Sequence, residues 1–416
     1  MASASFAPLR HRRFALALGS NFISSTGTWM QSVALGVYLT VTTHNAVWLG
    51  VLTVAAWLPA LIGSPLGGVM ADRYSRQRWI QVNNLVMAAT ASALALAELT
   101  HHLSPVLACY LAVAEGLCGS ASWAAWQSLL RDLVEPDEVL AAVSLGSAQF
   151  NLGRIIGPVF AAATLALGSP GWCFVANAVS FITVVVAFSF VRTPPRPRMT
   201  TRLAILSETW EGVRASWHSR GCRNAIAGVG TVGLLISPFI TLVPAMAIDV
   251  LHAGKVGTSW LVTAQGVGAV LGALTLPALA RRTSRLFVLR ASMLAIALAE
   301  ALYSQAPNLT SSALALVLLG ASYVGTLTGL NTAVQLHAPA FERSRILSIY
   351  VLSLSLFYPV GALVQATLAH HVGVRTVSLG AALAFAALFG ALSFFRPQYW
   401  HEMGPTPSHL TPAVAD

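Results

Sequence analysis

The chain has 416 residues, of which 56% are hydrophobic and only 9% are charged. Soluble globular proteins average roughly 25% charged residues, so this composition excludes a soluble protein and indicates a polytopic membrane protein. The net charge of +10 would suggest a nucleic-acid partner in a soluble protein. Here the basic residues gather in short loops between apolar runs, so the expected partner is the lipid bilayer and not nucleic acid.

Apolar runs of ~20 residues or more, the length that spans a bilayer, recur along the whole chain. They predict twelve spans in two sets of six. The first set covers residues 14–41, 46–71, 79–99, 105–131, 140–168 and 171–191, and the second covers 222–249, 256–280, 286–304, 310–336, 345–371 and 374–396. The expected fold is an all-α polytopic membrane protein with two pseudo-symmetric six-helix bundles, at 1–191 and 222–396. A cytoplasmic linker with an amphipathic helix joins them at 192–221, and a flexible cytoplasmic tail follows at 397–416.

The basic residues predict the orientation of the spans. If the N-terminus is cytoplasmic, all but three of the 24 Lys and Arg residues lie on the inner side. The exceptions are Lys255 and Arg375, in outer turns, and Arg154, within a span. Positive residues mark cytoplasmic loops, so we expect both termini in the cytoplasm and the chain in the plasma (bacterial inner) membrane.

The first span carries a polar stripe at helical spacing, formed by Asn21, Ser24, Thr28 and Gln31. Two interpretations remain open. The stripe can line a wet cavity, or it can make hydrogen bonds between neighbouring helices. Later spans hold weaker cavity candidates of the same polar kind, namely Gln149, Asn151, Gln265, Tyr323, Asn331, Tyr358 and Gln365.

A dense charged cluster separates the second and third predicted spans, from Gly67 to Arg78. Such a cluster cannot lie in hydrocarbon, so it predicts a short cytoplasmic turn. The candidate gating residues in this turn are Gly68, Asp72, Arg73, Arg76 and Arg78. We interpret the cluster as a latch between helix ends at the inner face, with a simple topology signal as the alternative.

Two charged residues lie near mid-depth in neighbouring antiparallel spans, Glu115 and Arg154. Charged groups inside a membrane are costly and are functional candidates by default. The hypothesis is that Glu115 is the protonatable group that couples transport to protons, while Arg154 influences its protonation or meets an anionic substrate. A static buried ion pair is the alternative. Nearer the outer rim, Glu98, Asp249 and Glu300 are expected to face water, with a proton relay as their alternative role.

Metal, cofactor and catalytic sites are not expected. The four cysteines show no C-x-x-C spacing, and the histidines gather near span ends without a convincing metal spacing. No phosphate-binding Walker A sequence and no nucleophile constellation occurs. The sequence therefore predicts a protein that is not an enzyme and needs no cofactor.

The arrangement of spans and motifs resembles the major facilitator superfamily. Six plus six spans, a basic central linker and the pattern Gly68-x-x-x-Asp72-Arg73-x-x-Arg76 carry this resemblance. Ser75 stands where that pattern usually has glycine. The C-terminal half holds a weaker copy of the pattern at residues 280–285, and in this copy Arg281 stands in place of the acid. In the fifth span, Gly153-Arg154-Ile155-Ile156-Gly157-Pro158 resembles the core of a motif associated with antiporters. The stretch 129–154 is similar to the exporter group that contains enterobactin and macrolide efflux proteins.

The resemblance implies a secondary transporter that works by alternating access between two bundles. It implies export of a small, fairly apolar molecule, such as a drug, a siderophore or a secondary metabolite, by proton antiport from a monomer. An importer or uniporter of a metabolite remains open, and a non-transporting membrane sensor is a more remote alternative.

Overall fold

The computed structural model describes residues 6–191, 205–339 and 342–404, without the side chains of 72, 205–209 and 344. The part of the chain that it describes is helical and contains no strand. Much of the predicted linker and most of the predicted tail, at 192–204 and 405–416, lie outside these residues.

The N-terminal half forms six membrane spans. They are α2 (Arg12–Thr43), α3 and α4 together (Val47–Trp57 and Ala60–Arg73), α5 (Arg76–Leu99), α6 (Pro105–Leu130), α7 (Val139–Leu167) and α8 (Gly171–Ser189). Short 3-10 turns, η1 (Ala7–Arg10) and η2 (Pro136–Glu138), precede α2 and α7. The break between α3 and α4 falls at Leu58 and Pro59, where the proline removes a backbone donor from the helix.

The C-terminal half forms six further spans after the linker helix α9 (Ile205–His218). The first span is composite: α10 (Arg220–Thr231), the π-helical segment η3 (Val232–Ile236), α11 (Phe239–Ala245) and a second π-helical segment, η4 (Met246–Val250). The others are α12 (Gly254–Arg282), α13 (Arg285–Gln305), α14 (Leu309–His337), α15 (Arg343–Val372) and α16 (Val374–Phe395), followed by the short α17 (Gln398–His401).

These helices confirm the predicted fold class, and each predicted span matches a helix or a composite span within a few residues. By length and hydropathy, 11 stretches of the described chain are able to cross a membrane. The remaining span, α2, is 32 residues long but carries the polar stripe, which lowers its hydropathy. Serine and asparagine side chains cap the first turns of five spans, at Ser75, Ser104, Ser219, Ser284 and Asn308.

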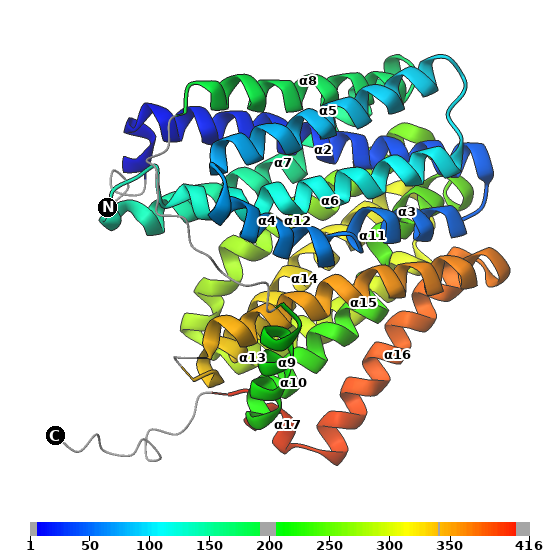
Figure 1. Ribbon diagram of the computed structural model, residues 1–416. Helices are drawn as coiled ribbons and strands as arrows, with labels where there is room; N and C mark the ends of the chain where they lie inside the picture. The colour runs from blue at the N-terminus through cyan, green and yellow to red at the C-terminus, as the bar shows by residue number, and fades with distance from the viewer. Residues whose placement is uncertain (1–5, 192–204, 340–341, 405–416) are drawn as a thin grey trace.

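The packing of the helices repeats between the halves. In the N-terminal half α5 packs on α6 and α8, and α4 packs on α6; in the C-terminal half α13 packs on α14 and α16, and α12 packs on α14. Figure 1 shows helices α2 to α8 as one bundle and α10 to α16 as the other. If the chain is a transporter, as the resemblance implies, repeats of this kind predict a transport site where the two bundles meet.

The largest contacts between the bundles are those of α7 with α12 and of α3 with α15, and α11 also packs on α2 and α3. We call the end with the α2–α3 and η4–α12 turns the outer end, following the expected topology. Near this end a β-carbon added to Gly50 of α3 would lie 2.8 Å from the Cα atom of Leu363 in α15. One buried apolar cluster also joins Leu49 of the first half to Ala247 and Ala366 of the second. The two halves are therefore packed together at the outer end.

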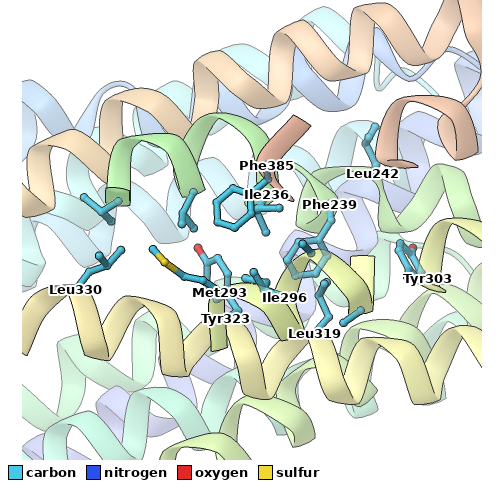
Figure 2. Close-up of a cluster of buried hydrophobic side chains, with 14 of the residues drawn as sticks. Ile236, Phe239, Leu242, Met293, Ile296, Tyr303, Leu319, Tyr323, Leu330 and Phe385 are labelled. Carbon is cyan, nitrogen blue, oxygen red and sulfur yellow. The ribbon is translucent and has the colours of Figure 1, made fainter. Parts of the chain in front are cut away.

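The interior of the C-terminal half is a large apolar core. Figure 2 shows part of it, with Ile236, Phe239, Met293, Ile296 and Phe385 among the labelled side chains. These side chains come from η3, α11, α13 and α16, so one core fixes helices that are distant in sequence. Burial of this kind makes the half a stiff unit that can move against the other half.

The linker helix α9 packs on α15, which belongs to the C-terminal half. Its Glu211 forms an ion pair with Arg345 over 3.1 Å. Trp210 and Trp217 are 69% and 66% exposed, so both large aromatic rings point away from the protein. Exposed tryptophans on an amphipathic helix suit the membrane interface.

Candidate functional site

Glu115 of α6 is held by neutral partners inside the N-terminal half. Gln31 of α2 donates a hydrogen bond to its Oε2 atom over 2.5 Å, and the hydroxyl of Thr90 in α5 lies 3.1 Å from its Oε1 atom. Asn177 of α8 donates to the Gln31 oxygen over 2.9 Å. Gln31 and Asn177 are only 2% and 0% exposed. Four spans therefore meet in one buried polar network around a single carboxyl group.

The network can serve Glu115 both with and without a proton. The Thr90 hydroxyl lies within reach of two acceptors, the Met87 carbonyl oxygen at 2.9 Å and Glu115 Oε1 at 3.1 Å. A hydroxyl donates one hydrogen bond at a time. It donates to Glu115 when that group is a carboxylate. When Glu115 is protonated, its own O–H can donate to Thr90, and Thr90 then donates to Met87.

Arg154 of α7 lies at the boundary between the halves and not beside Glu115. Its Nη2 atom donates to Oε1 of Gln265 in α12 over 3.2 Å, and its guanidinium carbon lies 5.2 Å from the ring centre of Trp29 in α2. None of the ion pairs given by the described residues includes Arg154 or Glu115. The static Glu115–Arg154 ion pair weighed from the sequence is thus not found in this conformation.

The antiporter-like motif explains why Arg154 reaches Trp29. A β-carbon on Gly153 would lie 2.9 Å from that of Ser25, and one on Gly157 would lie 2.7 Å from the carbonyl oxygen of Thr26. Any larger residue would push α7 away from α2, since real β-carbons do not approach so closely. The two glycines and the buried Pro158 therefore fix the α2–α7 contact that positions Arg154.

Aromatic rings surround the boundary near Arg154. Phe150 of α7 lies between Trp29 and Trp123, with ring centres 6.0 Å and 5.2 Å away. From α3, Trp57 makes an edge contact with Tyr358 of α15 over 5.4 Å. Trp57 and Trp123 are 44% and 41% exposed, so their faces remain available for contacts. The region combines one cation, several aromatic faces and few other charges.

Hydroxyl groups also join the two halves. The Thr53 and Thr241 hydroxyls lie 3.0 Å apart across the α3–α11 contact, and Thr241 lies 3.1 Å from the Tyr358 hydroxyl. Tyr323 pairs with Ser237 over 3.0 Å inside the C-terminal half. The structure thus places the predicted Tyr323 and Tyr358 in buried hydroxyl contacts near the boundary.

Other residues predicted for the cavity have more local partners. Asn21, Thr28 and Asn151 each donate to a carbonyl oxygen one turn back in their own helix, and Asn331 accepts from Gln335. Gln149 donates to the Asn21 carbonyl and the Ser25 hydroxyl, so it ties α7 to α2. Gln365 donates to two carbonyls of η3. Thr28 and Asn151 are exposed, which leaves them able to face a cavity.

Sequence reasoning missed several residues of this region. Asn177, Thr90, Trp29 and Thr241 were not predicted, although three of them hold the predicted Glu115 or Arg154 directly or through one partner. Asn177 offered a usable signal, because a buried asparagine amide in the largely apolar span α8 is costly unless it has hydrogen-bond partners. The other three residue types are common in membrane spans and carried no such signal.

The inner turn between α4 and α5 contains a buried ion pair. Arg76 pairs with Asp132, which follows α6, and their side chains are 12% and 5% exposed. Arg73 and Arg78 are exposed, and the side chain of Asp72 lies outside the described part of the chain. A β-carbon on Gly68 would meet nothing within 4 Å, whereas Gly67 approaches Ala121 of α6. In the predicted latch it is therefore Gly67, and not Gly68, that allows close packing against a neighbouring helix.

The three acids expected to face water at the outer end have different environments. Glu98 accepts hydrogen bonds from the Ser169 hydroxyl and from the Gly171 backbone over 3.1 Å, and it lines an outer cavity of about 310 Å³. Asp249 pairs with His44 across the two halves over 3.2 Å. For Glu300 the expectation is wrong, because this residue is 0% exposed. The position of Glu300 along its span indicated only that it lies near the outer end of the helix. It did not indicate that the side chain lies on the face of the helix that packs into the core.

Comparison with known proteins gives a consistent result over nearly the whole chain. The family described as transmembrane secretion effector matches residues 3–414. The staphyloferrin A transporter of Staphylococcus aureus (strain NCTC 8325 / PS 47) is 22% identical, with 86% of this chain and 90% of that protein aligned. The multidrug efflux pump Tap of Mycolicibacterium fortuitum is 26% identical, with 85% and 89% aligned. The enterobactin exporter EntS of Salmonella choleraesuis (strain SC-B67) is 26% identical, with 74% of each chain aligned.

Solved structures support the fold. A bacterial homologue of the human lysosomal transporter Spinster, in an inward-facing and occupied conformation, superimposes with a TM-score of 0.75. It is 14% identical, and the match covers 96% of this chain and 99% of that one. The nucleoside transporter NupG superimposes with a TM-score of 0.73 at 12% identity, covering 92% and 99%. Both proteins share the arrangement of helices with this chain.

Proposed function

The chain belongs to the transmembrane secretion effector family of the major facilitator superfamily, and we propose that it exports a small, largely apolar molecule by proton antiport. Membership makes it an integral membrane transporter and not an enzyme. Relatives named for siderophore and multidrug export support the outward direction and suggest a drug, a siderophore or another secondary metabolite as substrate. We further propose a monomer with both termini in the cytoplasm, divided into bundles at 1–191 and 222–396.

One observation carries the proposal: the two mid-depth charges occupy separate sites. Glu115 lies among neutral partners in the N-terminal half, whereas Arg154 lies at the boundary between the halves without an acidic partner in the described chain. The Nε2 atom of Gln265 beside it is buried and has no acceptor there either. A cation and a free amide donor next to aromatic rings favour a substrate with an acidic group and a planar apolar part.

Separate sites allow one cycle to use both charges. In this conformation the halves are closed at the outer end, so substrate would enter from the inner side. A substrate anion would compete with Gln265 for the Arg154 guanidinium. It would thereby break the hydrogen bond between Arg154 of α7 and Gln265 of α12. Loss of that contact would free the bundles to rock, and Glu115 would exchange its proton between the two sides. The inner latch around Arg76 and Asp72 would control closure of the opposite end.

The substrate should be identified first and its transport measured second. Metabolites in the medium of cells that make the wild-type protein are compared with those of cells that lack it. Molecules that the wild type alone accumulates outside are then tested in inside-out vesicles with an acidic lumen. The proposal expects accumulation that a protonophore abolishes, and Glu115→Gln should leave only equilibration. Equilibration by the wild type would indicate a uniporter, and absence of any differential metabolite would contradict export.

A further inference from the structure

Glu300 is a buried carboxyl group without a partner. It lies on α13, about one and a half turns before the outer end of that helix. The residue is 0% exposed, and neither of its carboxyl oxygens has a hydrogen-bond partner among the residues described. No ion pair within that same part of the chain includes it. This differs from Glu115, whose two oxygens both have partners.

Other unpartnered polar groups lie on the helices around it. The hydroxyl of Tyr303, almost one turn further along α13, is buried and has no hydrogen-bond partner among the described residues. The same holds for Ser312 near the outer end of α14 and for Ser259 near the outer end of α12. Because α12, α13 and α14 pack on one another, these groups belong to one region of the C-terminal half. A carboxyl and three hydroxyls thus lie there with unused hydrogen-bonding capacity.

The surroundings of Glu300 are apolar. Figure 2 shows Ile296 and Tyr303, which flank Glu300 along α13, within the buried core of this half. Ala297 and Ala299 belong to the same cluster. A carboxylate in such a place would lose its hydration and gain nothing in return, which is prohibitive for an unpaired charge. We therefore infer that Glu300 carries a proton in this conformation.

No nearby cation replaces that proton. Helix α13 packs on α12, α14, α16 and η3, and η3 contains no titratable side chain. The titratable groups within the spans are Tyr303 and Tyr323. At the outer helix ends Arg375 donates to the Ala306 carbonyl over 2.8 Å, and Lys255 lines the outer cavity. The remaining charged or titratable groups of these helices lie toward the inner ends, at Arg281, Arg282, Arg285, Arg290 and His337.

We propose that Glu300 is a second proton-binding site, which is loaded from the outer side before the outer end closes. Helix α12 separates this region from the N-terminal half, because it packs on both α7 and α14. When α12 and α7 part, water gains a short route past Ser259, and Glu300 can release its proton. Closure returns Glu300 to the apolar core and requires the proton again. This inference rests on the proposed alternating, proton-coupled transport. Because Glu300 takes up and releases its proton at the outer side, it controls closure of the outer end and does not itself carry a proton across the membrane.

The test measures outer closure directly as a function of pH. Spin labels are placed at His102→Cys and His371→Cys, two exposed residues in outer turns of opposite halves, in a background without the four native cysteines. Pulsed electron paramagnetic resonance gives the distances between the two labels from about pH 5.5 to about pH 8.5, without substrate. In the wild type the closed fraction should fall as pH rises, by up to about tenfold in the closed-to-open ratio per pH unit for each linked proton.

Glu300→Gln mimics the protonated carboxyl group, so the outer end of this variant should remain closed across the pH range. Any pH dependence that also disappears in Glu115→Gln is assigned to Glu115 and not to Glu300. Glu300→Leu should behave in the same way, which guards against an effect of the amide alone. Glu135→Gln is the matched control, because Glu135 is exposed at the inner end, and it should keep the wild-type response. A wild-type response in both Glu300 variants would overturn the inference. So would closure of the wild type by sodium at constant pH, since the ligand would then be a metal cation.

The outcome can be separated from that of the transport experiment. If vesicles show proton-driven export but the Glu300 variants keep the wild-type pH response, the second site is wrong and antiport stands. If export does not depend on a proton gradient but the pH response vanishes in the Glu300 variants, antiport is wrong and the pH-dependent closure stands.

Discussion

Arg154 of α7 donates a hydrogen bond to Gln265 of α12 over 3.2 Å, and this contact joins the two halves of the transporter at mid-depth. The same guanidinium lies over Trp29 of α2, so one side chain connects three helices. Because no acid in the described chain neutralises it, the charge is available to a ligand. A contact between the halves that a substrate can compete for is a direct way to couple binding to movement.

Replacement of Arg154 should therefore affect acidic substrates most. Arg154→Gln removes the charge, and we expect transport of an acidic substrate to fall by about tenfold or more, since a charge-assisted hydrogen bond is lost. Arg154→Lys keeps the charge but loses the planar group above Trp29, so it should restore only part of the activity. Initial rates in vesicles measure both effects. Arg214→Gln, at an exposed position in α9, is the control. Equal losses for neutral and acidic substrates would argue against a role in charge recognition.

The polar network around Glu115 predicts a specific role for Gln31. Gln31→Leu leaves the Nδ2 atom of Asn177 and the Oε2 atom of Glu115 without the partner that Gln31 supplies, at a cost of about 1–3 kcal/mol for each unsatisfied atom. The pH dependence of export should also change, because Glu115 loses the donor that favours its charged form. Thermal unfolding and the pH profile of transport are the measurements. Ser144→Ala is the control, since Ser144 is exposed and its hydroxyl donates to a carbonyl oxygen of its own helix. An unchanged pH profile in Gln31→Leu would separate this network from proton coupling.

Gly157 should tolerate no side chain. In Gly157→Ala the added methyl group would lie 2.7 Å from the Thr26 carbonyl oxygen and from the Trp29 β-carbon. We expect a loss of about 1–3 kcal/mol in stability, typical of overpacking, together with movement of Arg154 away from Trp29. The melting temperature and the tryptophan emission report these two changes. Gly19→Ala is the matched control on α2, where a β-carbon meets nothing within 4 Å. If both variants behave alike, the motif does not fix the α2–α7 contact.

Glu115 and Arg154 show which features of the structure could be predicted from the sequence and which could not. Hydropathy and length determine where a span begins and ends, so the twelve spans and the mid-depth positions of Glu115 and Arg154 could be predicted. Depth alone does not give the direction in which a side chain points around its helix. That direction depends on close contacts such as Gly157 against Thr26, which turn Arg154 toward α12 and away from Glu115.

Glu300 illustrates the same limit at the outer end. Its place near the end of α13 suggested contact with water, but its face of the helix packs into the C-terminal core. The π-helical segments η3 and η4 were not predicted either, because the extra residue per turn has no marker in the hydropathy pattern.

The buried ion pair at the inner turn should be much more important for stability than the ion pair at the outer end. Arg76 and Asp132 are 12% and 5% exposed, whereas His44 and Asp249 are 71% and 32% exposed. Removal of one partner from a buried pair costs about 3–5 kcal/mol, while an exposed pair contributes roughly 0–1 kcal/mol. Arg76→Gln should therefore lower the stability strongly, and His44→Ala should have little effect.

Replacement of both charged partners separates a lost attraction from a stranded charge. Arg76→Leu combined with Asp132→Leu removes both charges of this pair, and it should recover part of the stability that either single variant loses, because neither charge stays buried without the other. Thermal unfolding in detergent gives the comparison, and vesicle transport of the stable double variant tests the latch itself. If the inner turn acts in gating, that variant should be well folded yet slow in turnover. A double variant with wild-type transport would assign Arg76 and Asp132 a role in folding alone.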